Sequence, residues 1–343
     1  MKLIKNYFIF IFWLISVRLF FPFTLSTFLF VPLSYSQDIW KCGTIAPPGS
    51  EYEKVINRII KEINKVINVE VKVYYANSFG DEIDIAKELK AGKLDCGILT
   101  GNGLGYISPY SRVLELPFLI KTRSEWERVR PRLTVILTNA MRSEGWELFG
   151  LFGIGFVYFL SKYPIENLQD FSGRTFWVWK TNIIQIESYN VLKIFGAKPL
   201  EISVLDIPAF YDSLDIMWGP KYAFVAYGWY RYFKYIMYPP TLYFPGGIVV
   251  SSEKIRKYSP EQLARLRDMF EREIRNITNE LEQLNEKSLE ILLRSGIKKV
   301  EIKDADKLEH AFKSSMYESF KKYIPSWLIV SVMEEVLKVR DTK

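Results

Sequence analysis

Apolar and polar positions along the chain define a first series of short strands and helices. Residues 39–45, 69–75 and 94–99 are short apolar or alternating runs that predict strands. Apolar residues at three- and four-residue spacing predict helices that begin after Ser50 and at Glu82. This β-α-β-α-β order predicts a parallel sheet with right-handed crossovers, whose ligand-binding edge lies at the loops that follow the strands.

Two of these loops, residues 46–50 and 100–105, are therefore expected to face a ligand. The second contains the run Gly-Asn-Gly-Leu-Gly from Gly101 to Gly105. A dinucleotide-binding fingerprint would need a further glycine at Tyr106 and a helix that opens there, and the sequence shows neither. We predict a loop whose backbone closely approaches another group.

A second series of the same kind follows an apolar, glycine-punctuated segment at residues 148–160. The predicted strands are residues 174–180, 199–204 and 215–219, and the predicted helices are residues 183–195 and 206–214. The pattern repeats although the sequences do not, which predicts two lobes of similar architecture.

A long helix is predicted to follow the second series. Ser259 and Gln262 form a capping box with proline at the first helical position, and apolar residues then recur at helical spacing to about Arg294. At 1.5 Å per residue this helix is roughly 50 Å long. A coiled coil would explain one seam of apolar residues, but Ser288 interrupts the second seam, so we favour a helix that bridges both lobes.

These patterns assign the chain to five parts. The assignment is a signal peptide at 1–36, a first lobe at 37–155 to which residues 243–265 return, a second lobe at 156–242, the bridging helix at 259–295 and C-terminal helices at 296–343.

The first 36 residues have the layout of a secretory signal peptide. Two lysines precede an apolar run, no acidic residue occurs, and residues 34–36 (Ser-Tyr-Ser) form a small-x-small cleavage pattern. We expect export to the periplasm and maturation at Gln37. An uncleaved membrane anchor is the alternative, although Arg18 and Pro22 interrupt the apolar run.

Composition excludes several classes of function. The formal charge of +7 over 343 residues is modest and scattered, so we predict no nucleic-acid partner. The chain has a single histidine, His310, which argues against Ser-His-Asp or Cys-His catalysis. Asp212 and Asp215 are expected to be solvated caps near a helix end. We therefore predict a protein that is not an enzyme and that uses no cofactor or metal.

Only two cysteines occur, Cys42 and Cys96, and each falls in a predicted strand. An exported protein could pair them, and buried unpaired thiols are also common, so the sequence leaves both states open. With one histidine they cannot form a closed structural zinc site of the usual kind.

The segment from Arg174 to Lys180 reads Arg-Thr-Phe-Trp-Val-Trp-Lys. Trp177 and Trp179 are two positions apart on a predicted strand, so both indoles point to the same side. Burying one such ring contributes on the order of 4–6 kcal/mol as an upper bound. Two interpretations remain open: both rings belong to the core, or at least one lines a ligand cleft.

Five short stretches add a family resemblance. They are Asn77 to Glu82 (Asn-Ser-Phe-Gly-Asp-Glu), Gly92 to Asp95, Val113 to Leu119, Leu168 to Gly173, and Val250 to Lys254. In this order, which spans nearly the whole chain after the leader, the set resembles the solute-binding proteins of tripartite ATP-independent periplasmic (TRAP) transporters, the DctP-like family.

The resemblance implies an α/β, two-lobed periplasmic-binding-protein fold of type II-like form, in which each lobe is a mixed sheet flanked by helices and a long helix braces both. It also implies an extracytoplasmic protein that closes on a small organic ligand and delivers it to TRAP-type membrane permease subunits. In typical members an arginine on the strand after the Leu-x-Gly turn pairs with a substrate carboxylate, and the equivalent position here is Trp177. A second arginine commonly follows Gly-Phe, where this chain has Val157 after Phe156.

These departures change the expected ligand. An indole cannot form the bidentate charge-assisted bonds that a guanidinium makes to a carboxylate, and an unpaired dicarboxylate would be costly to desolvate. We therefore predict a hydrophobic or amphipathic organic ligand. The predicted second-lobe wall is Trp177, Trp179, Trp218 and Tyr222, with Phe156 and Tyr158 as further candidates, and the facing first-lobe residues are Asn102, Leu104 and Ser50.

The same scaffold would also suit a ligand-sensing or lipid-shuttling periplasmic protein that works without a TRAP permease. In that case the basic, aromatic segment 227–238 would be a docking face for a partner or a membrane surface. A helix face whose long cationic side chains snorkel explains the same segment.

Overall fold

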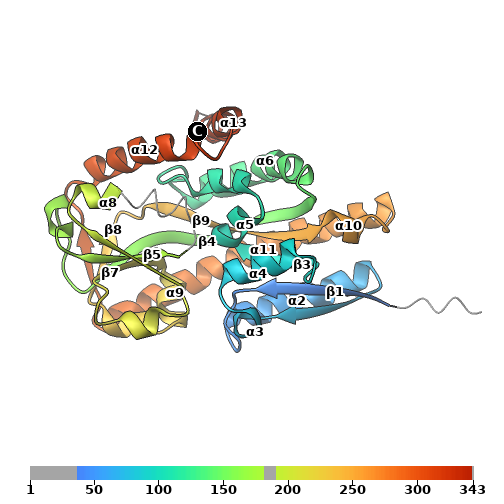
Figure 1. The fold of residues 1–343 in the computed structure, drawn as a ribbon, viewed down its shortest axis with the longest axis horizontal. Coiled ribbons are helices and arrows are strands. Elements are labelled where there is room, and N and C mark those ends of the chain that lie inside the picture. The colour runs from blue at the N-terminus through green and yellow to red at the C-terminus, as the bar shows by residue number, and fades with distance from the viewer. Residues whose placement is uncertain (1–36, 181–190, 342–343) are drawn as a thin grey trace, which may run out of the picture. The chain divides into compact units, whose positions relative to one another are not determined.

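The computed structural model describes residues 37–180 and 191–341. The strands are β1 (Asp38–Thr44), β2 (Val69–Tyr74), β3 (Cys96–Thr100), β4 (Trp146–Ser161), β5 (Thr175–Trp179), β6 (Lys198–Ile202), β7 (Ile216–Pro220), β8 (Tyr235–Tyr238), β9 (Leu242–Ser251) and β10 (Lys298–Glu301). They join in one mixed sheet in the order β2-β1-β3-β9-β4-β7-β5-β6, while β8 pairs with β4 and β10 (Figure 1). The predicted mixed α/β class is confirmed.

The helices surround this sheet. They are α2 (Glu51–Val66), α3 (Ala76–Phe79), α4 (Glu82–Lys90), α5 (Gly101–Ile107), α6 (Arg123–Arg142), α8 (Val191–Ile194), α9 (Lys221–Ala226), α10 (Ser252–Ile255), α11 (Pro260–Arg294), α12 (Ala305–Lys321) and α13 (Ser326–Asp341), with 3-10 turns at Pro109–Glu115, Leu168–Phe171, Ile207–Phe210 and Trp229–Tyr232. In the described part of the chain, no helix combines the length and apolarity that a membrane crossing requires.

Both predicted parallel series are present. Strand β1 runs parallel to β2 and β3, and β5 runs parallel to β6 and β7. The two series are connected by antiparallel pairing that the sequence did not predict: β9 pairs with β3 and β4, and β4 pairs with β7. The long strand β4 therefore belongs to both halves of the sheet. The division of the chain into two lobes stays a prediction.

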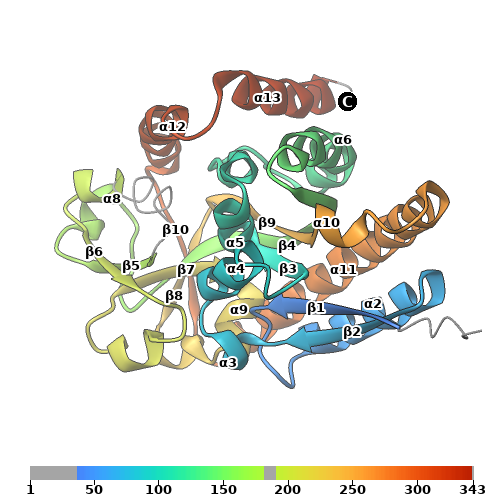
Figure 2. The same ribbon diagram turned by 45° about the vertical axis from the view of Figure 1, so that its right-hand side comes forward.

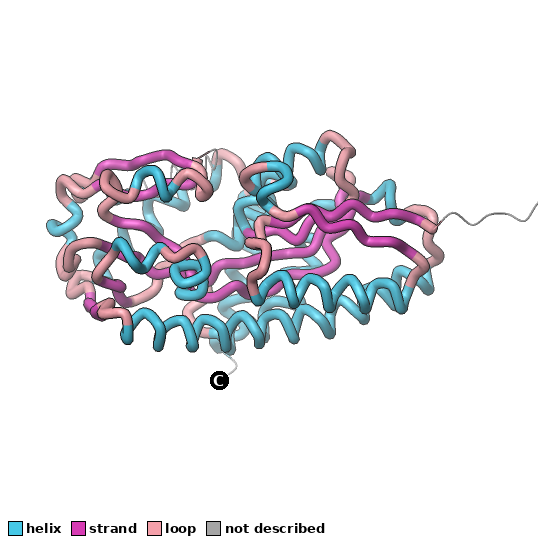
Figure 3. The backbone as a smooth tube through the Cα atoms, turned by 90° about the horizontal axis from the view of Figure 1, so that it is seen from below, coloured by secondary structure: helices cyan, strands magenta, loops and turns pink. Residues whose placement is uncertain are grey.

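Helix α11 packs along β4 and is the long helix along the lower edge of Figure 3. Its capping box at Ser259 and its end at Arg294 agree with the sequence analysis. Glycines in β4 permit the close approach, because a Cβ on Gly150 would lie only 2.0 Å from Cδ1 of Ile274. Gly155 also has φ of +133°, a conformation that L side chains rarely adopt.

Two polar residues of α11 bond to the irregular part of β4. The strand has a register shift between Gly153 and Gly155. The Gly153 amide donates to Oγ1 of Thr278 at 3.2 Å, and Nδ2 of Asn285 donates to the Ile154 carbonyl at 2.7 Å. Oδ1 of Asn285 accepts from the amide of Tyr222, on α9, at 2.9 Å. One buried side chain therefore links α11 to β4 and to α9.

Helix α6 also packs against β4 and is joined to α11 by an ion pair between Arg130 and Glu271 at 2.6 Å. Within α6, Oγ1 of Thr138 donates to the Leu148 carbonyl of β4 at 3.1 Å. Figure 2 shows α13 beside α6, in agreement with their contacts. Helix α13 thus packs on α6, which lies against β4, whereas α12 contacts α8.

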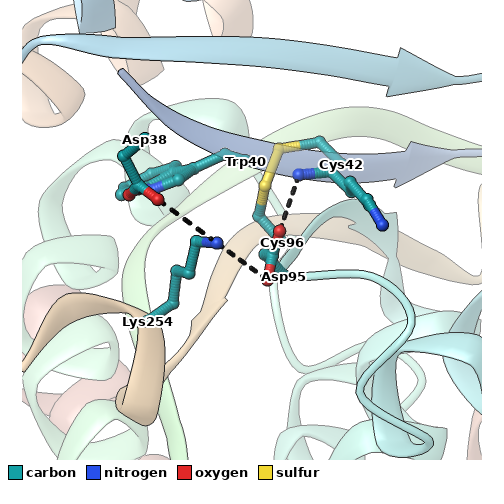
Figure 4. The surroundings of a disulfide bond; sticks show 7 residues. Asp38, Trp40, Cys42, Asp95, Cys96 and Lys254 are labelled. Atoms are coloured by element: carbon teal, nitrogen blue, oxygen red, sulfur yellow. Dashed lines mark hydrogen bonds and ion pairs between the residues drawn. A yellow bond between two sulfur atoms is a disulfide. The ribbon is translucent and has the colours of Figure 1, made fainter. Parts of the chain in front are cut away.

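Cys42 of β1 and Cys96 of β3 form a disulfide (Figure 4). The two residues are register partners in neighbouring parallel strands, with Cα atoms 4.4 Å apart. Lys254 lies between Asp38 and Asp95, with Nζ 3.4 Å from a carboxylate oxygen of each. The sequence left open whether the two cysteines pair, and the strand register brings them together.

The segment 100–105 is not the predicted loop but the start of helix α5, capped by Thr100, whose Oγ1 accepts from the Asn102 amide. The predicted close approach is present, since a Cβ on Gly103 would lie 2.8 Å from Cγ of Glu82. Gly101 and Gly105 pack in the same way on Glu115 and Arg112, so burial of the turn outweighs the poor helix propensity of the glycines.

The predicted helix at 206–214 was wrong in extent, because only the 3-10 turn Ile207–Phe210 forms. Ile207, Tyr211 and Leu214 are all buried, but beyond the turn the Asp212 carbonyl accepts from Nζ of Lys162 at 3.2 Å, so a tertiary contact holds this segment outside a helix. The predicted helix at 183–195 lies mostly outside the described residues, and its end is α8. The predicted signal peptide also lies outside them.

We predict that Asn285→Ala lowers the free energy of unfolding by about 2–4 kcal/mol, because the Ile154 carbonyl and the Tyr222 amide would be buried without partners. Urea unfolding followed by circular dichroism measures this change. Asn276→Ala, at an exposed position of the same helix, is the matched control and should change stability by less than about 0.5 kcal/mol. Equal effects of the two substitutions would contradict the role of Asn285.

Candidate functional site

Three tryptophans form a wall at one end of the second parallel series. Trp177 of β5 stacks on Trp218 of β7, with ring centroids 4.9 Å apart and an interplanar angle of 17°. Trp179 follows on the same face of β5, 5.6 Å from Trp177. The rings are nearly inaccessible to solvent, with Trp177 1% exposed and Trp179 5% exposed.

This wall borders a cavity of about 90 Å³. The facing residues come from the first series and include Ala46 and Pro47 after β1 and Thr100 at the end of β3. No lining residue in the described part of the chain is Lys, Arg, His, Asp or Glu. The cavity therefore offers aromatic and aliphatic surface and no formal charge.

Four of the predicted ligand-binding residues line the cavity, namely Trp177, Trp179, Trp218 and Tyr222, and their part in ligand binding stays a prediction. Tyr222 lies at its rim on α9, and its hydroxyl forms a hydrogen bond with the side chain of Ser50. Ser50 does not line the cavity itself and caps α2 instead, where its side chain accepts from the Glu53 amide.

Phe156 and Tyr158 lie outside the cavity. Phe156 packs edge-on against Tyr243, with ring centroids 4.8 Å apart. Tyr158 packs on Tyr238 with ring centroids 4.9 Å apart. Both residues belong to the middle of the sheet, where β9 and the segment around β8 cover them, and this pairing could not be read from local sequence.

Asn102 and Leu104 also lie outside the cavity, and both are fully buried. Leu104 packs on β9, since a Cβ on Gly247 would lie 3.0 Å from its Cδ1. The side-chain oxygen and nitrogen of Asn102 have no hydrogen-bond partner among the described residues. Because the segment is helical, these side chains turn into the protein and only Thr100 reaches the cavity.

Sequence reasoning missed Asp81, which connects the two series beside the tryptophan wall. Nε1 of Trp179 donates to both carboxylate oxygens of Asp81, at 3.0 and 2.9 Å, and the Ser203 hydroxyl donates to the same carboxylate. Asp81 also caps α4, by accepting from the Glu82 amide at 2.6 Å. By contrast, Nε1 of Trp177 donates to the Ile202 carbonyl on the adjacent strand.

Glu82, next to Asp81, is fully buried below the cavity-lining residue Thr100. Its carboxylate accepts from the Thr100 amide at 2.7 Å, the Thr100 hydroxyl at 2.5 Å and the Gly103 amide at 3.0 Å. Burial raises the pKa of Glu82 to about 7, because it outweighs the lowering by these hydrogen bonds. No cluster of three or more potential metal-ligating side chains occurs in the described ranges.

A family model and a sequence relative both describe solute-binding proteins. Residues 42–325 match the family described as bacterial extracellular solute-binding protein, family 7, or DctP. A solute-binding protein of Chromohalobacter salexigens is 22% identical over 297 residues, which cover 84% of this chain and 85% of the relative.

Solved structures show the same fold. A TRAP periplasmic solute-binding protein of Chromohalobacter salexigens with bound d-glucuronate has a TM-score of 0.77 at 20% identity, over 88% of this chain and 99% of that one. One from Desulfovibrio salexigens with bound orotic acid has a TM-score of 0.78 at 18% identity, over the same shares. The sugar acid binding protein of Advenella mimigardefordensis, with galactonate, has a TM-score of 0.77 at 17% identity, over 88% and 98%.

We predict that Trp179→Phe loosens the contact between β5 and α4, because the phenyl ring keeps the apolar packing but cannot donate to Asp81. Loss of a hydrogen bond to a charged group costs about 1.5–3 kcal/mol. Hydrogen exchange of the first turn of α4 should therefore speed up by about tenfold or more.

Trp177→Phe is the matched control, because the Trp177 indole donates only within the second series. It should leave exchange in α4 unchanged. Equal acceleration of α4 in both variants would contradict a specific link between Trp179 and Asp81.

We also predict a pH dependence of stability from Glu82. Its pKa in the folded protein is raised above the ordinary 4.5, so between about pH 4.5 and 7 the folded state keeps a proton that the unfolded chain has released. The free energy of unfolding should therefore fall by about 3 kcal/mol as the pH rises through this window. Urea unfolding at pH 5 and pH 8 tests this, and Glu82→Gln should show a flatter profile than the parent protein.

Proposed function

The chain belongs to the bacterial extracellular solute-binding protein family 7. From the lining of the tryptophan-walled cavity we propose that it binds a hydrophobic or amphipathic organic molecule there. The family consists of TRAP-type solute-binding proteins for small organic ligands rather than enzymes. The single observation that carries the proposal is the stacked pair Trp177 and Trp218 in a cavity whose described lining holds no charged side chain.

Two energetic terms favour an apolar guest. Each 100 Å² of apolar ligand surface removed from water against the indoles contributes about 2.5 kcal/mol. A carboxylate or a dense set of hydroxyls placed against the same wall would lose its hydration without gaining a charged partner. The relatives named above hold acids, so their ligands are a guide to molecular size and not to the chemistry of this wall.

Binding would involve closure of two lobes. The cavity is lined by residues of both parallel series, and the bond from Trp179 to Asp81 spans them at its side. We infer that this bond forms as the lobes, residues 37–155 and 156–242, close on the ligand. Signal-directed export would place the protein in the periplasm, where the closed form would deliver its ligand to TRAP-type permease subunits.

We predict that the protein binds octanoate and does not bind succinate, as measured by isothermal titration calorimetry. Trp218→Leu should weaken octanoate binding by about tenfold or more, because it removes one face of the indole stack. Trp146→Leu removes a buried tryptophan that does not line the cavity, so its affinity should stay within about twofold of the parent protein. Tight succinate binding without octanoate binding would refute the proposed ligand class.

A further inference from the structure

A second hollow, of about 350 Å³, adjoins the tryptophan-walled cavity. Both are lined by Pro47, Tyr222 and Ala226, so these three residues form the boundary between them. The outer hollow is otherwise formed by residues 48–50, by Val225 of α9 and by the stretch of α11 that includes Lys287 and Ser288. Ser288, which breaks the apolar seam of α11, thus lies in this hollow.

The sizes of the two hollows restrict how a ligand can lie. The inner cavity, about 90 Å³, is smaller than the cavity of about 150 Å³ that accepts a single benzene molecule. In the closed form it therefore accepts a slim apolar end such as an alkyl chain. The rest of any larger ligand must extend past Tyr222 into the outer hollow.

The charges of the two hollows also differ. Lys287 is the one charged residue among the described residues that line the outer hollow. It is exposed and takes part in no ion pair or hydrogen bond within the described part of the chain. The nearby cation Lys221 is already paired with Glu286 at 2.8 Å.

Acidic residues near the hollow are also engaged elsewhere. Glu51 pairs with Lys54 at 2.6 Å, and Glu53 accepts from the Gly49 amide at 2.5 Å. On α11, Glu290 pairs with Arg294 at 3.7 Å. No described carboxylate is bonded to Lys287, so its ammonium group is available to a ligand.

We propose that the ligand is an alkyl monocarboxylic acid that lies across both hollows, with its chain against the tryptophan wall and its carboxylate beside Lys287. This inference rests on the proposed function and adds the head-group chemistry and the orientation. Tyr222 lies between the two parts and contacts the middle of the ligand. The orientation removes the difficulty of desolvating an acid against indoles, since the carboxylate stays at the hydrated mouth.

The test compares octanoate with 1-octanol, which has the same chain and no charge, by calorimetry on the parent protein and on Lys287→Glu. Octanoate should bind more tightly than 1-octanol to the parent protein, and the difference should shrink in 0.5 M salt. An exposed ion pair contributes about two- to fivefold in affinity, and charge reversal replaces attraction with a similar repulsion. We therefore expect Lys287→Glu to weaken octanoate binding about tenfold and to leave 1-octanol binding within twofold.

Arg265→Glu is the matched control, because it reverses a charge at an exposed position of the same helix. The two sites are 22 residues apart, or about 33 Å along the helix, far beyond the screening length of about 8 Å. This variant should bind octanoate as the parent protein does.

Three outcomes would count against the inference, and they are distinguishable. Equal affinity of the parent protein for octanoate and 1-octanol, or unchanged octanoate binding by Lys287→Glu, would overturn the assigned head group while leaving the hydrophobic cavity in place. Absence of binding by both probes would overturn the proposed function, and this inference with it.

Discussion

The structure depends on the close packing of α11 against the glycine-rich strand β4. Without Cβ atoms at Gly150 and Gly155 the helix approaches the strand backbone directly, and Asn285 bonds to the strand where its regular pairing shifts. The same amide accepts from Tyr222 and so positions α9, which carries one rim of the cavity. A helix without this buried polar side chain would still pack on the sheet, but only the ion pair between Lys221 and Glu286 would then join it to α9 by a polar bond among the described residues.

The cavity presents indole surface and, among its described lining residues, no cation that could pair with an acidic ligand. Trp177 and Trp218 stack face to face, and the indole N–H of Trp177 is satisfied by the Ile202 carbonyl on the neighbouring strand. The wall is therefore a buried, closely packed apolar surface, which costs little to pre-organise for the apolar ligand that we propose. In the ligand orientation that we propose, specificity for a charged head group comes from the outer hollow, whose lining includes Lys287.

The adjacent carboxylates of Asp81 and Glu82 bond to different parts of the fold beside this wall. Asp81 accepts from Trp179 and Ser203 of the other parallel series, so its bonds depend on the relative position of the two series. Glu82 is fully buried, and its partners among the described residues all lie at the start of α5, so it stabilises the first series from within. Two neighbouring residues at the start of α4 thus supply a bond between the two series beside the cavity and an anchor beneath it.

The sequence by itself determined the features that depend on local chemistry. Helical spacing and the Ser259 capping box located α11, strand patterns located both parallel series, and the Trp-Val-Trp run placed two indoles on one face of a strand. Only the tertiary structure decided how β4 and β9 join the series, that Cys42 and Cys96 pair, and that Asp81 meets Trp179. In the tertiary structure Asn102 and Leu104 also point inward, because the glycine-rich segment is helical and Gly103 packs on Glu82. Caps and periodicity act within a few residues, whereas these contacts join segments far apart in the chain, whose pairing depends on the whole fold.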